Sequence, residues 1–248
     1  MTNRSLPHAC AVPLHTSDSV RVAPVPNTAP TVFASAFVAR APIGELDQEI
    51  TSCVGYEALH EEEKVWVSAH APRRVREFVA GRTALRAALR EAGADVSGPL
   101  LPGEQGRPDL PRGFTGSITH KDGQALAIGR RLLGARTLGI DSEVLGTRDR
   151  SSIARRVLTD IERARWEPEC SWPALLQTFS LKEAIYKALH PHVPRYIGFD
   201  EAEIATDGRI TMTLREGEGR FVLIGWSWWE GEPGPSRRLV SICEARPA

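Results

Sequence analysis

Two short stretches of the chain carry residue types that could bind a hard cation together with an anion. Asp141 and Glu143 are two residues apart and follow an apolar run, 137–140, that is typical of a strand. Because successive side chains of a strand alternate between its faces, these two carboxylates point the same way. Glu183 and Lys187 are four residues apart in an amphipathic segment, so they share one face of a helix.

Three carboxylates and an ammonium group of this kind could converge on one Mg²⁺ ion and a phosphate-bearing ligand. Mg²⁺ takes a few carboxylates and otherwise water and phosphate oxygens, and Asp141, Glu143 and Glu183 fit that supply. The metal would neutralise a diphosphate and stabilise charge on its leaving oxygen. Glu183 could also accept a proton from an attacking hydroxyl, and Lys187 could touch the same phosphates.

Each motif also has a purely structural interpretation. Asp-x-Glu at the end of a strand is common on protein surfaces, and Glu183 with Lys187 makes an ordinary i,i+4 ion pair. The combination of the two motifs therefore carries more weight than either motif alone.

Three further residues could contribute to an anion site. His120 ends an expected strand, 114–120, at the mouth of a turn, where functional residues often lie. Arg74 and Arg82 lie about two turns apart on a similar face of one helix. They could form an anion clamp or a solvated basic edge, and helix geometry alone does not decide between these.

The composition limits the class of protein. The 248 residues include 31 basic and 31 acidic ones, so the formal net charge of zero gives no argument for binding nucleic acid or an anionic membrane. No apolar run approaches the roughly 20 residues that span a bilayer, and the N-terminus lacks a basic-then-apolar signal sequence. The scattered cysteines predict reduced thiols rather than a zinc site or a disulfide framework: Cys10, Cys53, Cys170 and Cys243. We expect a cytoplasmic enzyme.

The first part of the chain predicts a leader, a strand and a long helical region. Residues 1–30 are rich in Pro, Ser, Thr and Ala without periodicity, which indicates a flexible leader. An apolar run predicts the first strand at 32–38. Helical periodicity then covers 56–91, with an interruption at Pro72 because proline breaks or restarts a helix.

The second part predicts strands and a helix around the acids. The runs 114–120 and 124–129 predict two strands joined by a tight turn at 121–123, and the next strand delivers the acids. A charged helical segment at 148–166 is expected to cover the site or the surface beside it. Ser171 as N-cap and Pro173 in the first turn predict a helix to about Leu189, and apolar runs after residue 200 predict an antiparallel meander.

The order of a helix followed by strands thus occurs twice, without a residue-level repeat. This order predicts an α+β fold made of two α/β halves. We place the N-terminal half at 31–136 and the C-terminal half at 137–248, with a site between them.

Five blocks of the sequence follow one another in a characteristic order, and among them the pair of Asp-x-Glu with Lys-Glu-x₃-Lys is specific, whereas the single blocks are not. They are REFVAGR at 76–82, GSITH at 116–120, LGIDSE at 138–143, FSLKEAIYKA at 179–188 and YIGF at 196–199. Together they resemble the 4′-phosphopantetheinyl transferases of the surfactin/enterobactin-synthetase type, and the first and last blocks resemble actinobacterial members. The resemblance covers about residues 33–245.

The resemblance implies a pseudo-twofold pair of α/β halves with coenzyme A in the cleft between them. It implies that Asp141, Glu143 and Glu183 hold Mg²⁺ on the coenzyme A diphosphate. Glu183 would be the base for the carrier serine, and Lys187, as a catalytic and cofactor-binding residue, would contact the diphosphate.

The same resemblance implies that His120 binds the 3′-phosphate of coenzyme A, together with Arg74 and Arg82. Lys121 is adjacent and receives no role. The loop 103–108 departs from the family pattern, because Gln105 stands where many members carry a basic residue, and Arg107 could substitute for it.

Another departure is Phe179, where members often have Trp. An aromatic ring is kept, so this change has little consequence.

The implied reaction is the Mg²⁺-dependent transfer of 4′-phosphopantetheine from coenzyme A to a serine of an acyl or peptidyl carrier protein, a holo-acyl-carrier-protein synthase activity that releases 3′,5′-ADP. Its targets would be polyketide, nonribosomal-peptide, siderophore or fatty-acid synthases. The expected partners are coenzyme A and apo carrier proteins, not nucleic acid or a membrane. A monomer is expected because the interface between the halves is internal.

Two other classes of function stay open. One is a coenzyme A-binding or carrier-binding protein without catalysis, against which the intact acid triad argues. The other is a different Mg²⁺-dependent phosphate enzyme, such as a nucleotide hydrolase, although the sequence has no GxxxxGK[ST] loop.

Overall fold

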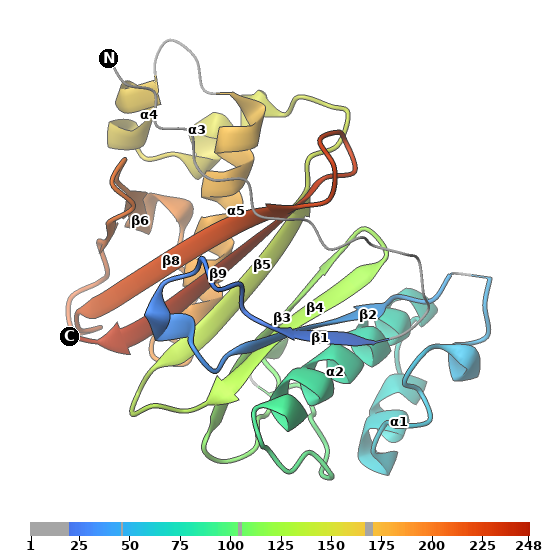
Figure 1. Ribbon diagram of the computed structural model, residues 1–248. Helices are drawn as coiled ribbons and strands as arrows, with labels where there is room; N and C mark the ends of the chain where they lie inside the picture. Colours follow the sequence, from blue (N-terminus) through green and yellow to red (C-terminus); the bar gives the residue numbers. More distant parts are fainter. Residues whose placement is uncertain (1–19, 46, 104–105, 167–170) are drawn as a thin grey trace.

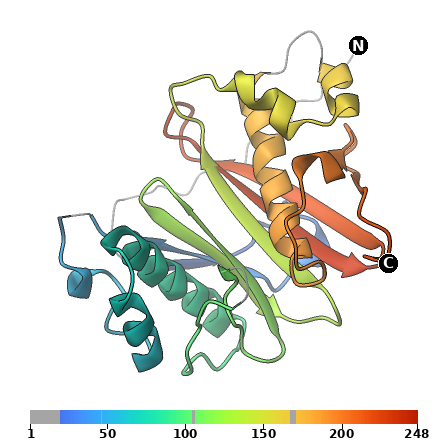
Figure 2. The same cartoon turned by 180° about the vertical axis from the view of Figure 1, so that it is seen from behind.

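Two antiparallel sheets, each covered on one face by a long helix, form the main body of the fold (Figure 1 and, from behind, Figure 2). This computed structural model describes residues 20–45, 47–103, 106–166 and 171–248. The arrangement confirms the predicted α+β fold and its repeated plan of helix and sheet.

The first sheet belongs to the N-terminal half and has the strand order β1-β2-β4-β3. Its strands are β1 (Arg21–Pro24), β2 (Phe37–Pro42), β4 (Gln124–Arg131) and β3 (Phe114–Lys121), and helix α2 (Pro72–Glu91) packs on it. Alanines dominate the contact on both sides, so the helix lies close to the strands: Ala80, Ala84 and Ala88 of α2 and Ala39, Ala41, Ala125 and Ala127 of the sheet.

The hairpin between β3 and β4 turns where the sequence predicts it. Asp122 and Gly123 both have positive φ, 49° and 70°, which is the geometry of a type I′ turn. This turn pairs Lys121 with Gln124 and His120 with Ala125, and so places His120 at the end of the strand.

The second sheet belongs to the C-terminal half and has the order β5-β9-β8. Its strands are β5 (Thr137–Val144), β9 (Arg238–Pro247) and β8 (Phe221–Glu230), and helix α5 (Trp172–Leu189) packs on them. The remaining elements are short: α1 (Glu61–Ser68), α3 (Ala154–Val157), α4 (Asp160–Trp166), β6 (Ala202–Ile204), β7 (Ile210–Met212) and 3₁₀ helices at Thr31–Phe33, Ile50–Ser52, Ser151–Ile153 and Phe199–Glu201.

Helix α5 lies directly on strand β5 because of one glycine. A Cβ atom added to Gly139 would lie 2.0 Å from the carbonyl oxygen of Ala184 and 2.6 Å from the backbone nitrogen of Ala188. Since these are backbone atoms, no side-chain movement could relieve the clash.

The two sheets share one core. Leu126 and Ile128 of β4 pack in the same apolar cluster as Leu138 and Ile140 of β5 and residues of β9. Strand β3 also touches β5 through side chains, since Thr115 Oγ1 accepts a hydrogen bond from the backbone N–H of Leu138 (3.1 Å). The residue boundary between the halves stays a prediction.

A buried ion pair bridges the sheets as well. The guanidinium of Arg130 donates to Glu244 Oε2 (2.8 Å) and to the carbonyl of Val32 (2.6 Å), and both charged side chains are 2% exposed or less.

The predicted leader and first strand need correction. Residues 21–24 form β1, which pairs with β2, and Val25 is buried, so the segment expected to be flexible up to residue 30 contributes an edge strand. Ser35 has a φ of 64° and turns the chain, so the strand expected at 32–38 begins only at Phe37. These features depend on backbone pairing and turning rather than on side-chain periodicity.

Other predicted elements differ in extent. The break at Pro72 is confirmed, but the preceding helix begins at Glu61 rather than near residue 56, after a capping box at His60. The segment 148–166 forms short helices, and the C-terminal strands do not form one meander, because β6 and β7 make a separate sheet. Cys53 and Cys243 are free and buried, whereas Cys10 and Cys170 lie outside the described residues.

Among the residues with described positions, no helix is both long and apolar enough to cross a bilayer.

Replacing Gly139 by alanine is expected to destabilise the fold by at least about 3 kcal/mol, because the new methyl group must push α5 off β5. Urea unfolding monitored by circular dichroism measures the change. Gly98→Ala is the matched control, since no atom lies within 4 Å of its added Cβ, and it should change stability by less than about 1 kcal/mol. Equal stabilities of the two variants would contradict the proposed close contact.

Candidate active site

Strand β5 and helix α5 bring Asp141 and Lys187 together. The ammonium group of Lys187 donates to Asp141 Oδ1 (2.8 Å) and to the carbonyl of Ile140 (3.0 Å). Thr119 of β3 donates to the same Oδ1 (3.1 Å), so both halves hold this carboxylate. Asp141 is 5% exposed, and its other oxygen, Oδ2, is buried with no hydrogen-bond partner among the described residues.

Glu143 lies next to Asp141 and is paired with a lysine that the sequence reading did not assign. Lys121, at the end of β3, has its Nζ 2.5 Å from Glu143 Oε2. Arg238 of β9 fixes this region, because it donates to the carbonyl of Lys121 (3.3 Å) and to Ser142 Oγ (3.0 Å). Burial raises the pKa of Glu143, an effect that Lys121 opposes and the charge of Asp141 increases.

Glu183 completes the acidic group from the side of α5. Burial raises the pKa of its carboxyl, the nearby ammonium of Lys187 lowers it, and the charges of Asp141 and Glu143 raise it. All three predicted carboxylates and Lys187 therefore act on one another electrostatically.

The donor set fits Mg²⁺, although the side chains do not form a complete metal site. Within the described ranges, no three His, Cys, Asp or Glu side chains are grouped so that they could hold a metal ion. Lys187 and Lys121 instead hold two of the carboxylates. Carboxylate oxygens are ligands that Mg²⁺ prefers. Oδ2 of Asp141 is buried and has no hydrogen-bond partner among the described residues, so it is an oxygen that a cation would coordinate. The Mg²⁺ expectation stays a prediction.

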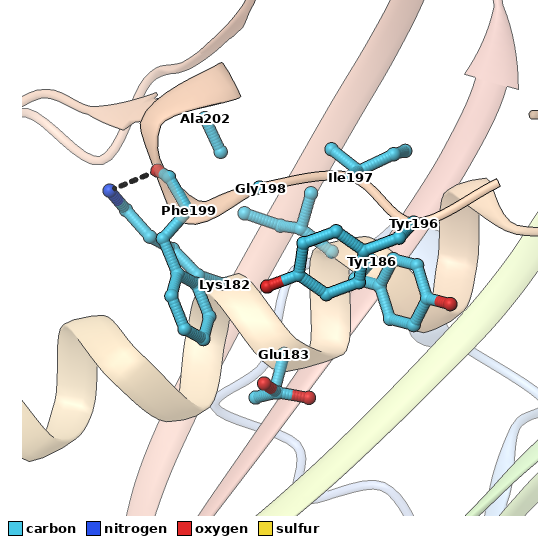
Figure 3. Close-up of a pocket in the computed structure, with 9 residues that line it drawn as sticks. Lys182, Glu183, Tyr186, Tyr196, Ile197, Gly198, Phe199 and Ala202 are labelled. Carbon is cyan, nitrogen blue, oxygen red and sulfur yellow. Dashed lines mark hydrogen bonds between the residues drawn. The ribbon is translucent and has the colours of Figure 1, made fainter. Parts of the chain in front are cut away.

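A small pocket lies beside Glu183 on helix α5 (Figure 3). Tyr186 of the helix and Tyr196 of the following loop form part of its wall, with ring centroids 6.0 Å apart. Ile197 and Phe199 extend the wall with apolar atoms. The pocket thus offers a largely apolar surface next to a carboxylate.

Lys182, one residue before Glu183, faces away from the acids. It is 2% exposed, and its Nζ donates to Glu162 Oε2 (2.6 Å), Val157 O (2.8 Å) and Phe199 O (2.9 Å), which uses all three protons. Burial lowers the pKa of Lys182, and Glu162 opposes this effect. The first lysine of the Lys-Glu-x₃-Lys motif is therefore a structural residue that ties α5 to its neighbours.

Glu162 is a residue that sequence reasoning missed, although a signal was present. Thr159 and Glu162 form the Thr-x-x-Glu pattern of a capping box, in which Glu162 Oε2 accepts from the N–H of Thr159 (2.8 Å). Its other oxygen accepts from the N–H of Ile204 (2.8 Å). Thr119 and Lys121 were also missed, and their only signal was their position beside His120.

His120 packs against α2 at Gly81. A Cβ atom at Gly81 would lie 2.7 Å from His120 Nε2, so the glycine makes room for the ring. Nε2 donates to the backbone carbonyl of Glu77 (2.7 Å). Burial lowers the pKa of His120 to about 4, so its ring is neutral near pH 7.

The two predicted arginines lie in different environments. Arg74 is half exposed, with its guanidinium 3.9 Å from Glu77 Oε2. Arg82 is 5% exposed, donates to the carbonyl of Leu100, and stacks 4.4 Å from the ring of Phe78. Burial lowers the pKa of Arg82 to about 10. A solvated basic edge is therefore wrong for Arg82, whereas the anion clamp stays a prediction.

The loop that departs from the family pattern is only partly described. Gln105 lies outside the described residues, and Arg107 is exposed, with its backbone carbonyl accepting from Gly103 (2.7 Å). Phe179 packs against Phe199 at 5.5 Å between ring centroids, which places an aromatic ring where one was expected.

Comparison with known proteins identifies relatives over most of the chain. The family profile described as "4′-phosphopantetheinyl transferase N-terminal domain" matches residues 61–129, and the "4′-phosphopantetheinyl transferase superfamily" profile matches residues 137–240. 4′-Phosphopantetheinyl transferase Svp of Streptomyces mobaraensis is 38% identical over 156 residues, which is 60% of this chain and 61% of that protein.

A second relative is matched over a longer stretch. 4′-Phosphopantetheinyl transferase PptT of Mycobacterium tuberculosis is 33% identical over 179 residues, or 69% of this chain and 75% of that protein. A solved structure described as the Chronobacterium ammoniagenes ACPS-CoA complex matches with a TM-score of 0.34 and 18% identity, over 46% of this chain and 99% of that one, which is too weak to add to the assignment.

The low pKa of His120 in the folded protein is expected to reduce the free energy of unfolding as the pH falls. Its pKa is about 4 in the folded protein and about 6.5 when unfolded, so only the unfolded chain takes up this proton as the pH drops from 6.5 towards 4. In His120→Gln, the loss of unfolding free energy over that interval should be smaller by on the order of 1–3 kcal/mol. Urea unfolding at pH 7.5 and pH 5 measures it, with exposed His70→Gln as control. Parallel pH profiles of wild type and His120→Gln would contradict the assigned burial.

Replacing Lys182 by methionine is expected to destabilise the fold by about 3–5 kcal/mol, because it leaves the buried Glu162 carboxylate without its counterion. Adding Glu162→Gln should restore part of this stability by removing the charge. Lys64→Met, at an exposed pair with Glu61 on α1, should lose less than about 1 kcal/mol. Thermal unfolding of the wild type and these three variants measures the differences, and a double variant no more stable than Lys182→Met would refute the buried pair.

Proposed function

Because the chain belongs to the 4′-phosphopantetheinyl transferase superfamily, we propose that it transfers 4′-phosphopantetheine from coenzyme A to a serine of an acyl or peptidyl carrier protein. The second product is 3′,5′-ADP. The matched segment spans 61% of the length of the Svp relative, so activity, substrates and partners are proposed on the chemistry of the site.

The observation that carries the proposal is the set of side chains that meet at the carboxylate of Asp141. One carboxylate receives hydrogen bonds from Lys187 of α5 and Thr119 of β3, while Glu143 and Glu183 lie within electrostatic reach. A diphosphate next to these groups would meet an ammonium and a set of oxygens suited to a divalent cation in one place.

Asp141, Glu143 and Glu183 would hold Mg²⁺. When bound, the ion supplies charge neutralisation for the diphosphate and for the leaving oxygen. Within the described part of the chain, Lys187 has one N–H left after its bonds to Asp141 and Ile140, and this proton would be donated to a phosphate oxygen.

In the proposed transfer step, Glu183 accepts the proton that the serine loses. The serine oxygen forms a bond to the phosphorus that carries pantetheine, and the bond from that phosphorus to the bridging oxygen of 3′,5′-ADP breaks. The serine proton passes to the carboxylate of Glu183, directly or through a water. Burial raises the pKa of Glu183, which makes it a stronger base than an exposed glutamate.

The remaining parts of coenzyme A also find complementary surfaces. The apolar side chains of Tyr186, Tyr196 and Ile197 beside Glu183 would offer a surface for part of the uncharged pantetheine arm, although their pocket itself is only about 50 Å³. His120, with Arg74 and Arg82, would bind the 3′-phosphate. Since Nε2 of His120 already donates to Glu77, its second ring nitrogen must be protonated to donate to that phosphate, and phosphate binding would raise the low pKa of the ring.

The carriers of polyketide, nonribosomal-peptide, siderophore and fatty-acid synthases all present a suitable serine, so the proposal includes each of them. The protein would act as a monomer, because its two sheets already share an internal core.

Incubation with coenzyme A and Mg²⁺ is expected to add one phosphopantetheinyl unit to at least one of several apo carrier proteins, as measured by intact mass. EDTA should abolish the gain. Glu183→Gln should lower the rate by on the order of 10²-fold or more, because the proton acceptor is lost. Glu62→Gln, at an exposed site on α1, is the matched control and should keep full activity.

Two results would contradict the proposal. Full activity of Glu183→Gln would refute its role as base. Calorimetric binding of coenzyme A without transfer to any carrier would indicate a binding protein that lacks catalysis.

A further inference from the structure

We propose that Glu63 of α1 is a positioning residue that holds the guanidinium of Arg82 ready for an anion, an inference that rests on the proposed coenzyme A site. Glu63 lies outside the acidic group at Asp141 and outside the five sequence blocks. It is 0% exposed, and its carboxylate connects three separate segments of the chain. The anion is a phosphate monoester, such as the 3′-phosphate of coenzyme A.

Both oxygens of the Glu63 carboxylate are used by donors of other segments. Oε1 accepts a hydrogen bond from the N–H of Leu100 (2.8 Å). Oε2 accepts from the N–H of His60 (2.9 Å) and lies 2.8 Å from Nη2 of Arg86. The carbonyl of Leu100 in turn accepts a hydrogen bond from Nε of Arg82. Glu63 therefore fixes the N-terminus of α1 and, through Leu100, the backbone group that holds Arg82.

The depth of this ion pair indicates that it fixes position rather than adds stability. Glu63 has no exposed surface and Arg86 is 6% exposed. Buried ion pairs add little net stability compared with apolar side chains, but they strongly disfavour arrangements in which one partner is left alone. Here the pair joins α1 to α2, and the two helices lie side by side in both views (Figures 1 and 2).

Phe78, one turn before Arg82 on α2, holds the same guanidinium from another side. The central carbon of the guanidinium lies 4.4 Å from the centre of the Phe78 ring. Trp66 of α1 stacks on this ring with 4.4 Å between the ring centroids. Helix α1 therefore supports Arg82 by two routes. An arginine that is already fixed loses less conformational freedom when it binds a ligand, and so it binds more tightly.

The fixed guanidinium keeps the groups that suit a phosphate. Within the described ranges, Nε is the only nitrogen of Arg82 that has a hydrogen-bond partner, so Nη1 and Nη2 remain for a ligand. Their N–H groups form the fork that binds two oxygens of one phosphate. Burial lowers the pKa of Arg82 to about 10 and the charge of Glu63 opposes this effect, so the guanidinium is charged near pH 7.

Coenzyme A and dephospho-coenzyme A differ only in the 3′-phosphate, so comparing them isolates this contact. A variant that only unfolds more easily loses affinity for both compounds. A variant in which Arg82 is no longer held in place loses affinity for coenzyme A alone. The ratio of the two dissociation constants is therefore a readout that a merely structural role of Glu63 would not change.

The test measures the Kd of wild type, Glu63→Gln and Arg82→Met for both compounds by calorimetry in the presence of Mg²⁺. Glutamine keeps one acceptor oxygen and replaces the other by an NH₂ donor, so it cannot accept from both Leu100 and His60. We expect Arg82→Met to lower the preference for coenzyme A about tenfold or more. Glu63→Gln should lower it about fivefold, with the Kd for dephospho-coenzyme A within about twofold of wild type.

A double variant tests whether Glu63 acts through Arg82. Glu63→Gln in the Arg82→Met background should leave the preference at the value of Arg82→Met alone, because both changes remove the same contact. Glu63→Gln/Arg86→Met covers the case in which Glu63→Gln does not fold, since it also removes the charge that is left without a counterion. This variant should show the same loss of about fivefold.

Leu89→Ala is the matched control for lost stability. Leu89 lies on the same helix, is 0% exposed and packs in the apolar core of the first sheet. The cavity left by this change destabilises the fold, but it involves none of the groups that hold Arg82. The preference for coenzyme A should therefore equal that of wild type.

The outcomes separate the positioning role from the proposed function. An unchanged preference in Glu63→Gln, or in Glu63→Gln/Arg86→Met, would overturn the positioning role and leave transfer standing. A wild type that binds both compounds equally, or an equal loss of preference in Leu89→Ala, would overturn it as well. The binding measurements need no transfer. A protein that shows the expected shifts but modifies no carrier would therefore support the positioning role and overturn the proposed function.

Discussion

The contact between α5 and β5 at Gly139 is the constraint on which the site depends. Without a Cβ at this position, the backbone of α5 at Ala184 rests on the strand. The neighbouring residue Glu183 and, one turn later, Lys187 then lie over the strand that carries Asp141. A side chain at position 139 would push the two elements apart and so act directly on the Lys187–Asp141 hydrogen bond.

Lysine side chains compensate the charge of the buried carboxylates in this region. Asp141 is almost fully buried and Glu143 partly so, and an uncompensated carboxylate at such a site would be strongly disfavoured. Lys187 and Lys121 supply the compensation from different elements, one from α5 and one from the β3–β4 hairpin. Their ion pairs show how the acids can be held close together and still leave oxygen atoms suited to a cation.

Two fully buried ion pairs fix the surrounding frame. Arg130 with Glu244 joins the two sheets, and Lys182 with Glu162 joins α5 to α4. Buried pairs add little net stability, but each strongly disfavours arrangements in which one partner is left alone, so they specify one relative position of the elements. In this way the hairpin that carries His120, the strand that carries the acids and the helix that carries Glu183 are held in one geometry.

Local sequence determined the features that depend on near neighbours along the chain. Alternation in a strand set the positions of Asp141 and Glu143, helical spacing set Glu183 and Lys187, and the break at Pro72 followed from proline chemistry. Only the tertiary structure decided that Lys182 is buried with Glu162 while Lys187 faces the acids, since both lysines lie on the same helix and are equally charged in sequence. It also decided the pairing of Lys121 with Glu143, the burial of Arg82, and the edge strand at 21–24. These depend on contacts between segments far apart in the chain, which residue spacing does not encode.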